Sequence, residues 1–373
     1  MARNFIPEPL ATLPWRVLMA LMLLVAFAAA VLYSAAGGAM YPYAAPHVMR
    51  FVLFLIMAVA ISYAPPDLVR WAAYPVYGVL IVLLLLVEAL GHISGGSQRW
   101  LNLGPLVLQP SELMKPTIVL VLASFYNTLP AGMVSNWRSL IPPAMLIGLP
   151  MALVLLQPDL GTALAVAFAG AIVMYLAGLP GKWFLGAGAA GVVAAPLAYF
   201  FVLHDYQRAR VTTFINPESD PMGTGYHITQ SQIAIGSGGI LGKGFGNGSQ
   251  SHLNYLPEAH TDFVFATMAE EWGLLGGLFV LLVFGIVLRW AWSVARRAPD
   301  RFSCLLAGGM TATIFFYVAI NMMMVMGLAP VVGIPLPFLS YGGSSMMTNM
   351  ICIGTLMMVD RWTRRAGRTS TLS

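Results

Sequence analysis

The stretch of residues 255–271, YLPEAHTDFVFATMAEE, places an ionisable side chain at the start of an apolar segment. Its polar part ends at Asp262, and the next four residues, FVFA, suit a lipid environment. A carboxylate at the edge of a membrane span costs free energy unless it is hydrated, paired or used in function, so Asp262 is a candidate functional residue. Its position also fits a simpler interpretation, in which the helix dipole stabilises a carboxylate in the first turn of a helix.

Further charged residues lie in short polar segments elsewhere in the chain, where they could bind a charged substrate. These residues are Arg99, Glu112, Lys115, Asp159, Arg208, Arg210 and Glu258. Glu112 and Lys115 are three residues apart, which is close enough on one helix face for an ion pair. Basic side chains gathered at a membrane edge suit an anionic lipid headgroup or a diphosphate. Arg50 and Lys243, by contrast, fit interfacial anchoring.

Nucleotide and zinc sites find little support in the sequence. Residues 236–249, GSGGILGKGFGNGS, are rich in glycine but match neither a P-loop nor a Gly-x-Gly-x-x-Gly fingerprint. Tightly turned backbone close to a ligand or a lipid explains these glycines better. Cys304 and Cys352 lie in apolar segments, which excludes a cysteine-based zinc site. Metal ligands stay unknown, although the short sequence His260-Thr261-Asp262 leaves a divalent cation open.

Composition assigns the chain to the membrane proteins. Of its 373 residues, 59% are hydrophobic and 9% are charged, whereas a soluble domain has about 25% charged residues. A helix needs about 20 residues to cross the hydrocarbon core of a bilayer. The candidate spans are residues 15–35, 45–64, 71–91, 113–129, 139–157, 160–179, 183–203, 263–289, 302–328 and 344–360. We therefore predict an all-α polytopic membrane protein with ten transmembrane helices in a single domain, residues 1–373.

The basic residues predict the orientation, because cytoplasmic loops carry the excess of Lys and Arg. With the N-terminus in the cytoplasm, thirteen of the 19 Lys and Arg residues lie inside and six lie outside, so both termini are expected inside. The outer segments are then 92–112, 157–161, 204–262 and 329–343. The large extracytoplasmic loop, 204–262, joins spans seven and eight. The last segment is rich in Pro and Gly, so we expect it to dip into the membrane interface or to pack on protein. None of the loops shows strand alternation.

Several motifs occur together across most of the chain. They are SQRWLNLG (97–104), QPSELMK (109–115), QPDLGT (157–162), DPMGTGYHITQSQIAIGSGG (220–239), LPEAHTDFVFA (256–266), AEEWG (269–273) and VVGIPLPFLSYGGSS (331–345). By these motifs and their order, the chain resembles the SEDS family (shape, elongation, division and sporulation proteins), polytopic enzymes that polymerise peptidoglycan. HDYQRARV (204–211) and the absence of a long N-terminal extension are more similar to the rod-shape elongation branch than to the division branch.

The resemblance implies a function and residues that perform it. It implies a peptidoglycan glycosyltransferase of the bacterial inner membrane that uses lipid II, a lipid-linked disaccharide-pentapeptide, and works with a class B penicillin-binding protein. The essential aspartate of the family aligns with Asp262, which as general base would take a proton from the acceptor sugar. Other motif residues align with Arg99, Glu112, Lys115 and Asp159. No nucleic-acid partner is expected, because the basic residues flank membrane spans.

Two other functions stay open at this point. A lipid flippase would use intramembrane charges such as Glu88, Glu270, Glu271 and Lys115 as a polar path. Against this, the charged residues concentrate at the outer face, and no inverted repeat of broken helices is evident. A non-catalytic scaffold for cell-wall enzymes fits the apolar mass but leaves the outer polar residues unexplained.

Cysteine labelling tests the predicted orientation. Single cysteines at Ser219 and Ser370, in a background lacking Cys304 and Cys352, should react with a membrane-impermeant thiol reagent from the outside and the inside, respectively. The expectation follows from the distribution of Lys and Arg. Reaction of both positions from the same side would contradict the ten-span topology.

Overall fold

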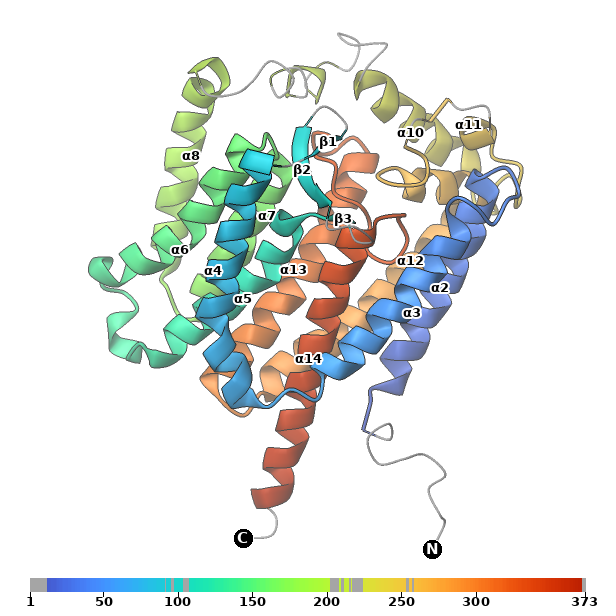
Figure 1. The fold of residues 1–373 in the computed structure, drawn as a ribbon. Helices are drawn as coiled ribbons and strands as arrows, with labels where there is room; N and C mark the ends of the chain where they lie inside the picture. The colour runs from blue at the N-terminus through green and yellow to red at the C-terminus, as the bar shows by residue number, and fades with distance from the viewer. Residues whose placement is uncertain are drawn as a thin grey trace, which may run out of the picture.

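The structure, a computed structural model, describes residues 12–90, 92–94, 97–102, 107–201, 208, 211–214, 216, 224–252, 255–256 and 258–370. Helices dominate these residues, as predicted (Figure 1). The long ones are α2 (Trp15–Ala35), α3 (Ala44–Ile61), α4 (Pro66–Leu90), α5 (Pro110–Thr128), α6 (Trp137–Leu156), α7 (Leu160–Leu176), α8 (Gly181–Phe201), α12 (Val264–Arg297), α13 (Arg301–Val325) and α14 (Gly343–Ser370). Each of the ten predicted spans coincides with one of these helices.

By length and composition, 7 of the described helices are able to cross a membrane, namely α2, α3, α4, α6, α8, α12 and α13. The other three predicted spans are less apolar or shorter. Helix α5 carries Glu112 and Lys115, α7 has 17 residues, and α14 ends in a basic segment. The chain is therefore a polytopic membrane protein whose polar helices lie among apolar ones.

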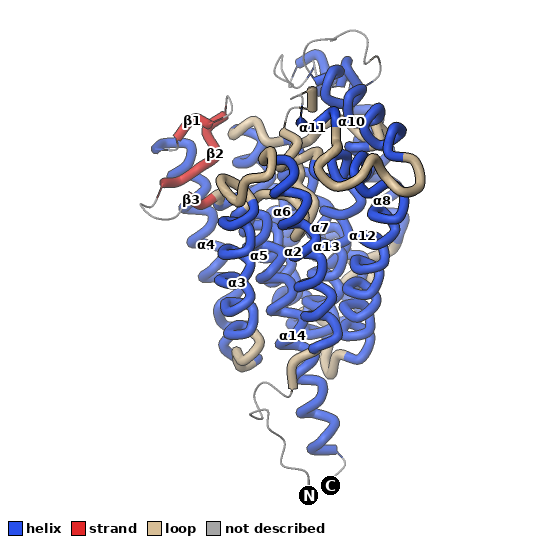
Figure 2. The backbone as a smooth tube through the Cα atoms, turned by 90° about the vertical axis from the view of Figure 1, so that its right-hand side faces the viewer, coloured by secondary structure: helices blue, strands red, loops and turns tan. Residues whose placement is uncertain are grey.

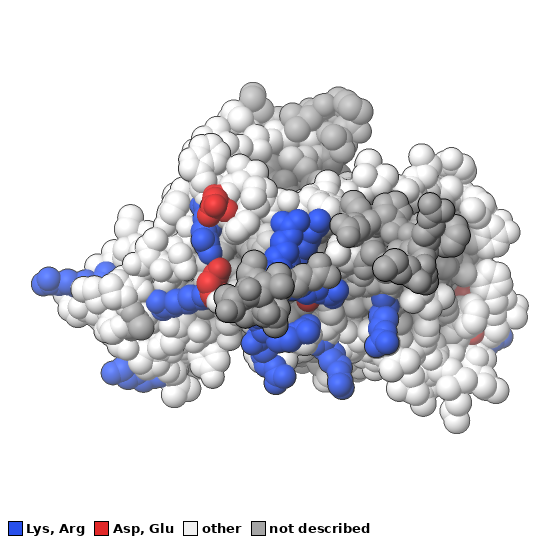
Figure 3. Space-filling view, turned by 90° about the horizontal axis from the view of Figure 1, so that it is seen from below, with Lys and Arg blue, Asp and Glu red and all other residues white. Residues whose placement is uncertain are grey.

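The long helices form a bundle, and both ends of the chain leave it at the same end (Figures 1 and 2). This placement of the termini agrees with an even number of spans. Seen from that end, the surface carries several Lys and Arg side chains (Figure 3). The opposite end of the bundle holds α10 (Thr224–Gly238), α11 (Ser249–His252) and a small sheet.

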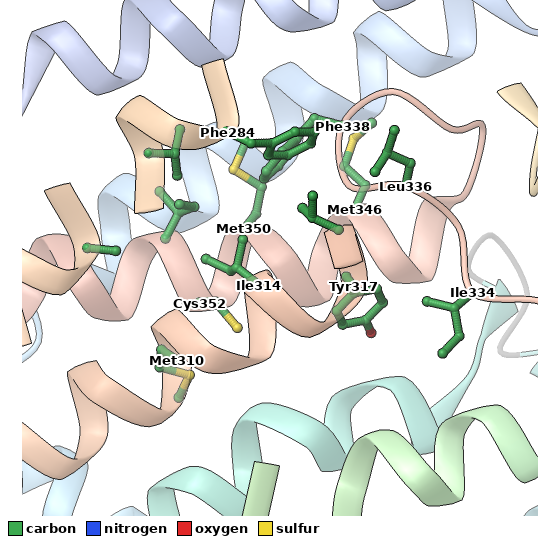
Figure 4. Packing of buried hydrophobic residues seen from close by; sticks show 14 of the residues in the cluster. Phe284, Met310, Ile314, Tyr317, Ile334, Leu336, Phe338, Met346, Met350 and Cys352 are labelled. Atoms are coloured by element: carbon green, nitrogen blue, oxygen red, sulfur yellow. The ribbon is translucent and has the colours of Figure 1, made fainter. Parts of the chain in front are cut away.

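Helix α13 lies at the centre of the bundle, where it contacts α5, α7, α12 and α14. Small residues permit this close packing, because a Cβ atom added to Gly309 would lie 2.4 Å from Val119 of α5. Tyr317 of α13 belongs to the same buried cluster as Met346 and Met350 of α14 (Figure 4). Helix α8 differs, since none of its most apolar stretch is buried.

The predicted outer loop 204–262 is partly helical, since it contains α10 and α11. Helix α10 packs against α12. The glycine-rich residues 236–249 include tight turns, as the sequence suggested, and they lie against the backbone of α12 at Gly238 and Gly242. A Cβ atom at Gly242 would lie 2.1 Å from the carbonyl oxygen of Glu271. Helix α12 bends nearby at Gly273, whose φ of 61° and ψ of −155° suit only glycine. Glycines on both sides thus allow the two backbones to touch.

Two buried carboxylates of α12 fasten the outer segments. Glu270 accepts hydrogen bonds from Lys243 Nζ at 2.6 Å and Ser249 Oγ at 2.9 Å. Glu271 accepts one from Ser34 of α2. Lys243 is therefore an ion-pair partner, not the interfacial anchor that the sequence suggested. Because Glu270 and Glu271 are 0% and 1% exposed and engaged in these bonds, they hold the fold together and do not line an open polar path.

A small antiparallel sheet forms in the segment before α5, where the sequence shows no alternating strand pattern. It consists of β1 (His92–Ser94), β2 (Ser97–Asn102) and β3 (Val107–Leu108), in the order β1-β2-β3. Strands of two to six residues are too short to show an alternating pattern. Strand β2 carries Arg99 and contacts α4 and α5, so the sheet sets the position of this arginine.

The segment after α13 has no regular structure and packs on protein, which is one of its two predicted placements. Leu336, Phe338 and Leu339 are at most 1% exposed. The backbone of this segment touches the start of α7, since a Cβ atom on Gly161 would lie 2.6 Å from the carbonyl oxygen of Val332. Gly161 therefore permits a contact that any larger residue would block.

Replacing Gly161 with alanine tests this contact. Gly161→Ala should lower the free energy of unfolding by about 1–3 kcal/mol, because the added methyl group overlaps a main-chain oxygen that cannot move aside easily. Gly148→Ala in α6 is the matched control, since a Cβ atom there meets nothing within 4 Å. It should be neutral or stabilising by up to about 1 kcal/mol. Equal thermal unfolding of the two variants in detergent would refute the close contact.

Candidate active site

Five of the eight predicted site residues line one cavity at the end of the bundle opposite the termini. The cavity has a volume of about 350 Å³, and these residues are Arg99, Glu112, Asp159, Glu258 and Asp262. They come from strand β2, from the starts of α5 and α7, and from the turn before α12. The tertiary structure thus joins segments that are more than 150 residues apart in the sequence.

Asp262 lies in the turn between residues 258 and 263, just ahead of α12. The N-cap residue of that helix is Phe263, and no acidic residue lies in its first turn, so the simple helix-dipole interpretation does not fit. The turn is shaped by Glu258, which has a positive φ of 55° and accepts a 2.7 Å hydrogen bond from Thr261 Oγ1. Gly333 faces the carboxylate, since its Cβ position is 3.5 Å from Asp262 Oδ2.

The predicted pair of Glu112 and Lys115 is confirmed, and a third residue joins it. Lys115 Nζ is 2.5 Å from Glu112 Oε1 and 2.8 Å from the Tyr317 hydroxyl oxygen. The Tyr317 hydroxyl donates to the other oxygen of Glu112. Lys115 and Tyr317 are 0% exposed, whereas Glu112 reaches the cavity. Lys115 is therefore placed behind Glu112, out of direct reach of a ligand in the cavity.

Asp159 and Arg99 organise the wall of the cavity at the start of α7. Asp159 is the N-cap of α7, accepts hydrogen bonds from Thr162 N and Oγ1 at 3.0 and 2.9 Å, and lies 3.6 Å from Arg99 Nη1. Arg99 also donates to the carbonyl oxygens of Gln157 and Pro158. These bonds fix the guanidinium group at the cavity wall, with 21% of the side chain exposed.

An aromatic cluster that the sequence did not indicate lies beside the cavity. The ring of His260 stacks on Tyr43 at a centroid distance of 4.1 Å, and Tyr341, which lines the cavity, lies edge-on to Tyr43 at 5.3 Å. Arg50, expected to be an interfacial anchor, lies 4.6 Å above the ring of Tyr341. Burial lowers the pKa of His260, an effect that the charge of Glu258 opposes. The close stacking on Tyr43 makes His260 a packing residue beside the cavity.

The other predicted residues are not gathered at the cavity. Arg208 donates a 2.9 Å hydrogen bond to the carbonyl oxygen of Phe200 at the end of α8 and does not line the cavity. Arg210 lies outside the described residues. Across the part of the chain that the structure describes, no three His, Cys, Asp or Glu residues are grouped so as to hold a metal ion. A divalent cation at Asp262 would thus need further ligands of another kind, such as backbone carbonyl groups, water or substrate oxygens.

A second, apolar cavity of about 480 Å³ lies deeper in the bundle, between α4, α5, α13 and α14. Leu113 and Pro116 line it, and in the chain they are direct neighbours of Glu112 and Lys115. On α14, Ile351 lines the apolar cavity and Ser345 the polar one. The same two helices therefore contribute to both cavities, which suits a ligand with a polar head and an apolar tail.

Removing Lys115 tests the buried ion pair. Lys115→Ala leaves the Glu112 carboxylate without its cation in a poorly solvated place, which should cost about 3–5 kcal/mol of stability. The double variant Glu112→Gln with Lys115→Met removes both charges and should unfold at a higher temperature than Lys115→Ala alone. Equal melting temperatures in detergent would mean that water solvates the pair.

Comparison with known proteins shows relatives along nearly the whole chain. The model of the cell cycle protein family FtsW/RodA/SpoVE matches residues 10–365. Peptidoglycan glycosyltransferase MrdB of Escherichia coli K12 is 43% identical over 357 residues, 92% of each chain. Stage V sporulation protein E of Bacillus subtilis is 35% identical over 291 residues, 76% of this chain and 77% of that one.

Solved structures agree with these sequence relatives. The crystal structure of the rod shape determining protein RodA of Thermus thermophilus matches with a TM-score of 0.70 and 29% identity, over 94% of this chain and 97% of that one. A chain of a peptidoglycan synthase complex matches with a TM-score of 0.80 and 30% identity, over 94% and 98%. The chain belongs to the SEDS family of membrane proteins, together with FtsW, RodA and SpoVE.

Proposed function

We propose that this chain is a peptidoglycan glycosyltransferase that polymerises glycan strands from lipid II during cell elongation, with Asp262 as the general base. The observation that carries the proposal is the cavity that Asp262 shares with Arg99, Glu112, Asp159 and Glu258. The relatives support the reaction class, because MrdB of Escherichia coli is a peptidoglycan glycosyltransferase.

The proposed reaction is a single displacement at the anomeric carbon of the donor sugar. A hydroxyl group of the acceptor sugar gives its proton to Asp262, and its oxygen forms the new bond to that carbon. The bond from the carbon to the lipid diphosphate breaks, and the diphosphate leaves with the electron pair. One displacement inverts the configuration at the carbon. General-base assistance of this kind contributes about 10²–10⁴ in rate.

The polar side chains of the cavity have distinct roles in this proposal. The Arg99 guanidinium, fixed at the wall, stabilises negative charge on the departing diphosphate. Glu112 and Glu258 accept hydrogen bonds from sugar hydroxyl groups. Asp159 positions Arg99, and Lys115 acts through Glu112, because burial keeps it from the substrate. Arg208, at the end of α8, attracts the anionic headgroup, and Arg210 is assigned the same role from its place in the sequence alone. A divalent cation shared with the diphosphate is compatible with this arrangement.

The lipid part of the substrate needs an apolar site, and the deeper cavity offers one. Its lining includes Val79, Leu83, Leu113 and Leu120, and Val79 is 60% exposed, so the cavity is open at the surface of α4. We assign the isoprenoid tail to this cavity and the diphosphate-linked sugar to the polar one. Burial of such a tail contributes about 25 cal/mol for each Å² of apolar surface removed from water.

Orientation and partner complete the proposal. We propose that both termini lie in the cytoplasm. The Lys and Arg side chains at the end of the bundle that the termini share support this orientation (Figure 3). The polar cavity then opens on the outer side of the inner membrane, where glycan strands are built. A class B penicillin-binding protein with a single span is the proposed partner, in keeping with the likeness to a chain of a peptidoglycan synthase complex.

Asp262→Asn tests the general base. The change keeps the side-chain volume but removes the proton acceptor, so glycan polymerisation from lipid II should fall by about 100-fold or more. Expression, thermal stability and lipid II binding should be unchanged. Asp67→Asn is the matched control. The Asp67 side chain is 95% exposed, lies in the first turn of α4 and does not line the cavity.

Polymerisation and lipid translocation are measured on the unmodified protein, on Asp262→Asn and on Asp67→Asn, each with and without the penicillin-binding partner. Polymerisation by Asp262→Asn within a few-fold of the unmodified protein would rule out Asp262 as the base. Translocation without polymerisation in the unmodified protein would instead identify a flippase.

A further inference from the structure

Two irregular segments form the Asp262 side of the cavity, and neither is held by secondary structure of its own. The first is the turn at 258–263, and the second is the segment 329–342, which contributes Gly333, Pro335 and Tyr341 to the cavity. Gly333 approaches the Asp262 carboxylate closely. The position of the carboxylate in the cavity therefore depends on what fastens these two segments to each other and to the bundle.

Asn321 of α13 makes bonds to both segments. Its Nδ2 atom donates to the carbonyl oxygen of Asp262 at 2.9 Å and to that of Ile334 at 2.8 Å. The two acceptors are carbonyl oxygens, so the bonds require the amide nitrogen and fix the orientation of the side-chain amide. One side chain thus uses both of its N–H groups to tie the main chain at Asp262 to the main chain beside Gly333.

Burial makes these bonds difficult to replace. Asn321 is 0% exposed, and Ile334 is 3% exposed, so water has little access to the donors or to the Ile334 carbonyl group. A buried carbonyl group without a donor is costly, and the segments would shift to find another partner. A separate bond, from Tyr341 N to the carbonyl oxygen of His260 at 2.9 Å, also joins the two segments. Loss of Asn321 should therefore loosen the turn without detaching it.

The support behind Asn321 is rigid and shared with the rest of the site. Tyr317 lies four residues earlier, on the same face of α13, and bonds to Glu112 and Lys115. One turn of the central helix therefore positions the α5 side of the cavity through Tyr317 and the Asp262 side through Asn321.

We propose that Asn321 is a positioning residue for the glycosyl transfer, which sets the place of the Asp262 carboxylate through the main chain of Asp262 and Ile334. The inference rests on the proposed function, in which Asp262 takes the proton of the acceptor hydroxyl. Catalysis is sensitive to such placement, since a shift of about 1 Å in a reacting group can cost about 100-fold in rate. Substrate affinity depends on other groups and should change little.

Asn321→Leu tests the proposal, because leucine branches at Cγ as asparagine does but has no hydrogen-bond donor. Polymerisation from lipid II should show a kcat lower by about 10- to 100-fold, with KM within about twofold of the unmodified protein. Asn321→Gln keeps the amide donors at a longer reach and should recover part of the loss. Thr313→Val is the matched control, because Thr313 is equally buried in α13 and its hydroxyl group bonds only to its own helix, at Gly309. It should retain normal kcat.

Each alternative outcome counts against the proposal. A kcat of Asn321→Leu within twofold of the unmodified protein, or a rise in KM at unchanged kcat, would overturn it. So would a loss of activity that matches the fraction of unfolded protein. If Asn321→Leu fails to fold, normal kcat in Asn321→Ala, which also lacks the amide donor, decides against the proposal. If Asp262→Asn remains active, the general-base assignment itself fails. An inactive Asp262→Asn beside a fully active Asn321→Leu refutes only the role of Asn321.

Discussion

Polar groups inside a membrane-embedded bundle must find their partners within the protein, and this requirement governs the architecture around α13. Lys115 is a fully buried cation, which is tolerable because Glu112 and Tyr317 surround its ammonium group. The carbonyl oxygens of Asp262 and Ile334 meet the amide of Asn321. The central helix is mostly apolar. Two of its polar side chains, Tyr317 and Asn321, lie one turn apart and satisfy groups from three other segments.

Close backbone contact is the second device that shapes the molecule. Gly161 lets the segment after α13 lie against α7, while Gly242 and Gly273 let the outer glycine-rich segment lie against α12. In each place the neighbouring main chain leaves no room for a side chain. At Gly161 the irregular segment after α13 is buried and becomes part of the cavity wall, so this glycine serves the positioning of the site. At Gly242 and Gly273 the contact fastens the segment after α10 to α12, outside the cavity lining.

The two cavities relate this architecture to the proposed chemistry. The polar cavity opens at the end of the bundle opposite the termini and holds four carboxylates, of which Asp159 lies beside Arg99 and Glu112 beside Lys115. The apolar cavity lies next to it along α5 and α14. A lipid-linked sugar has the same division between a charged head and an apolar tail. The polarity of the two cavities therefore suits the proposed substrate, a lipid-linked sugar.

The membrane class, the ten helices and the five charged residues at the cavity follow from the sequence alone. Long apolar runs specify helices in a bilayer irrespective of their neighbours, and the three-residue spacing of Glu112 and Lys115 specifies a pair within one helix. The motif around Asp262, at the border of polar and apolar residues, identified the candidate base before any contact was known. These properties are local, so a linear pattern is enough to reveal them.

The residues that support the candidate site are evident only from tertiary contacts. Tyr317 lies 202 residues after Lys115, and Asn321 lies 59 residues after Asp262, so no spacing rule connects them. Arg50 and Lys243 looked like interfacial anchors, yet one stacks on Tyr341 and the other pairs with Glu270. The strands near Arg99 were too short to leave a pattern. Each of these features depends on a partner from a distant segment, and packing of the helices, not the local sequence, brings such partners together.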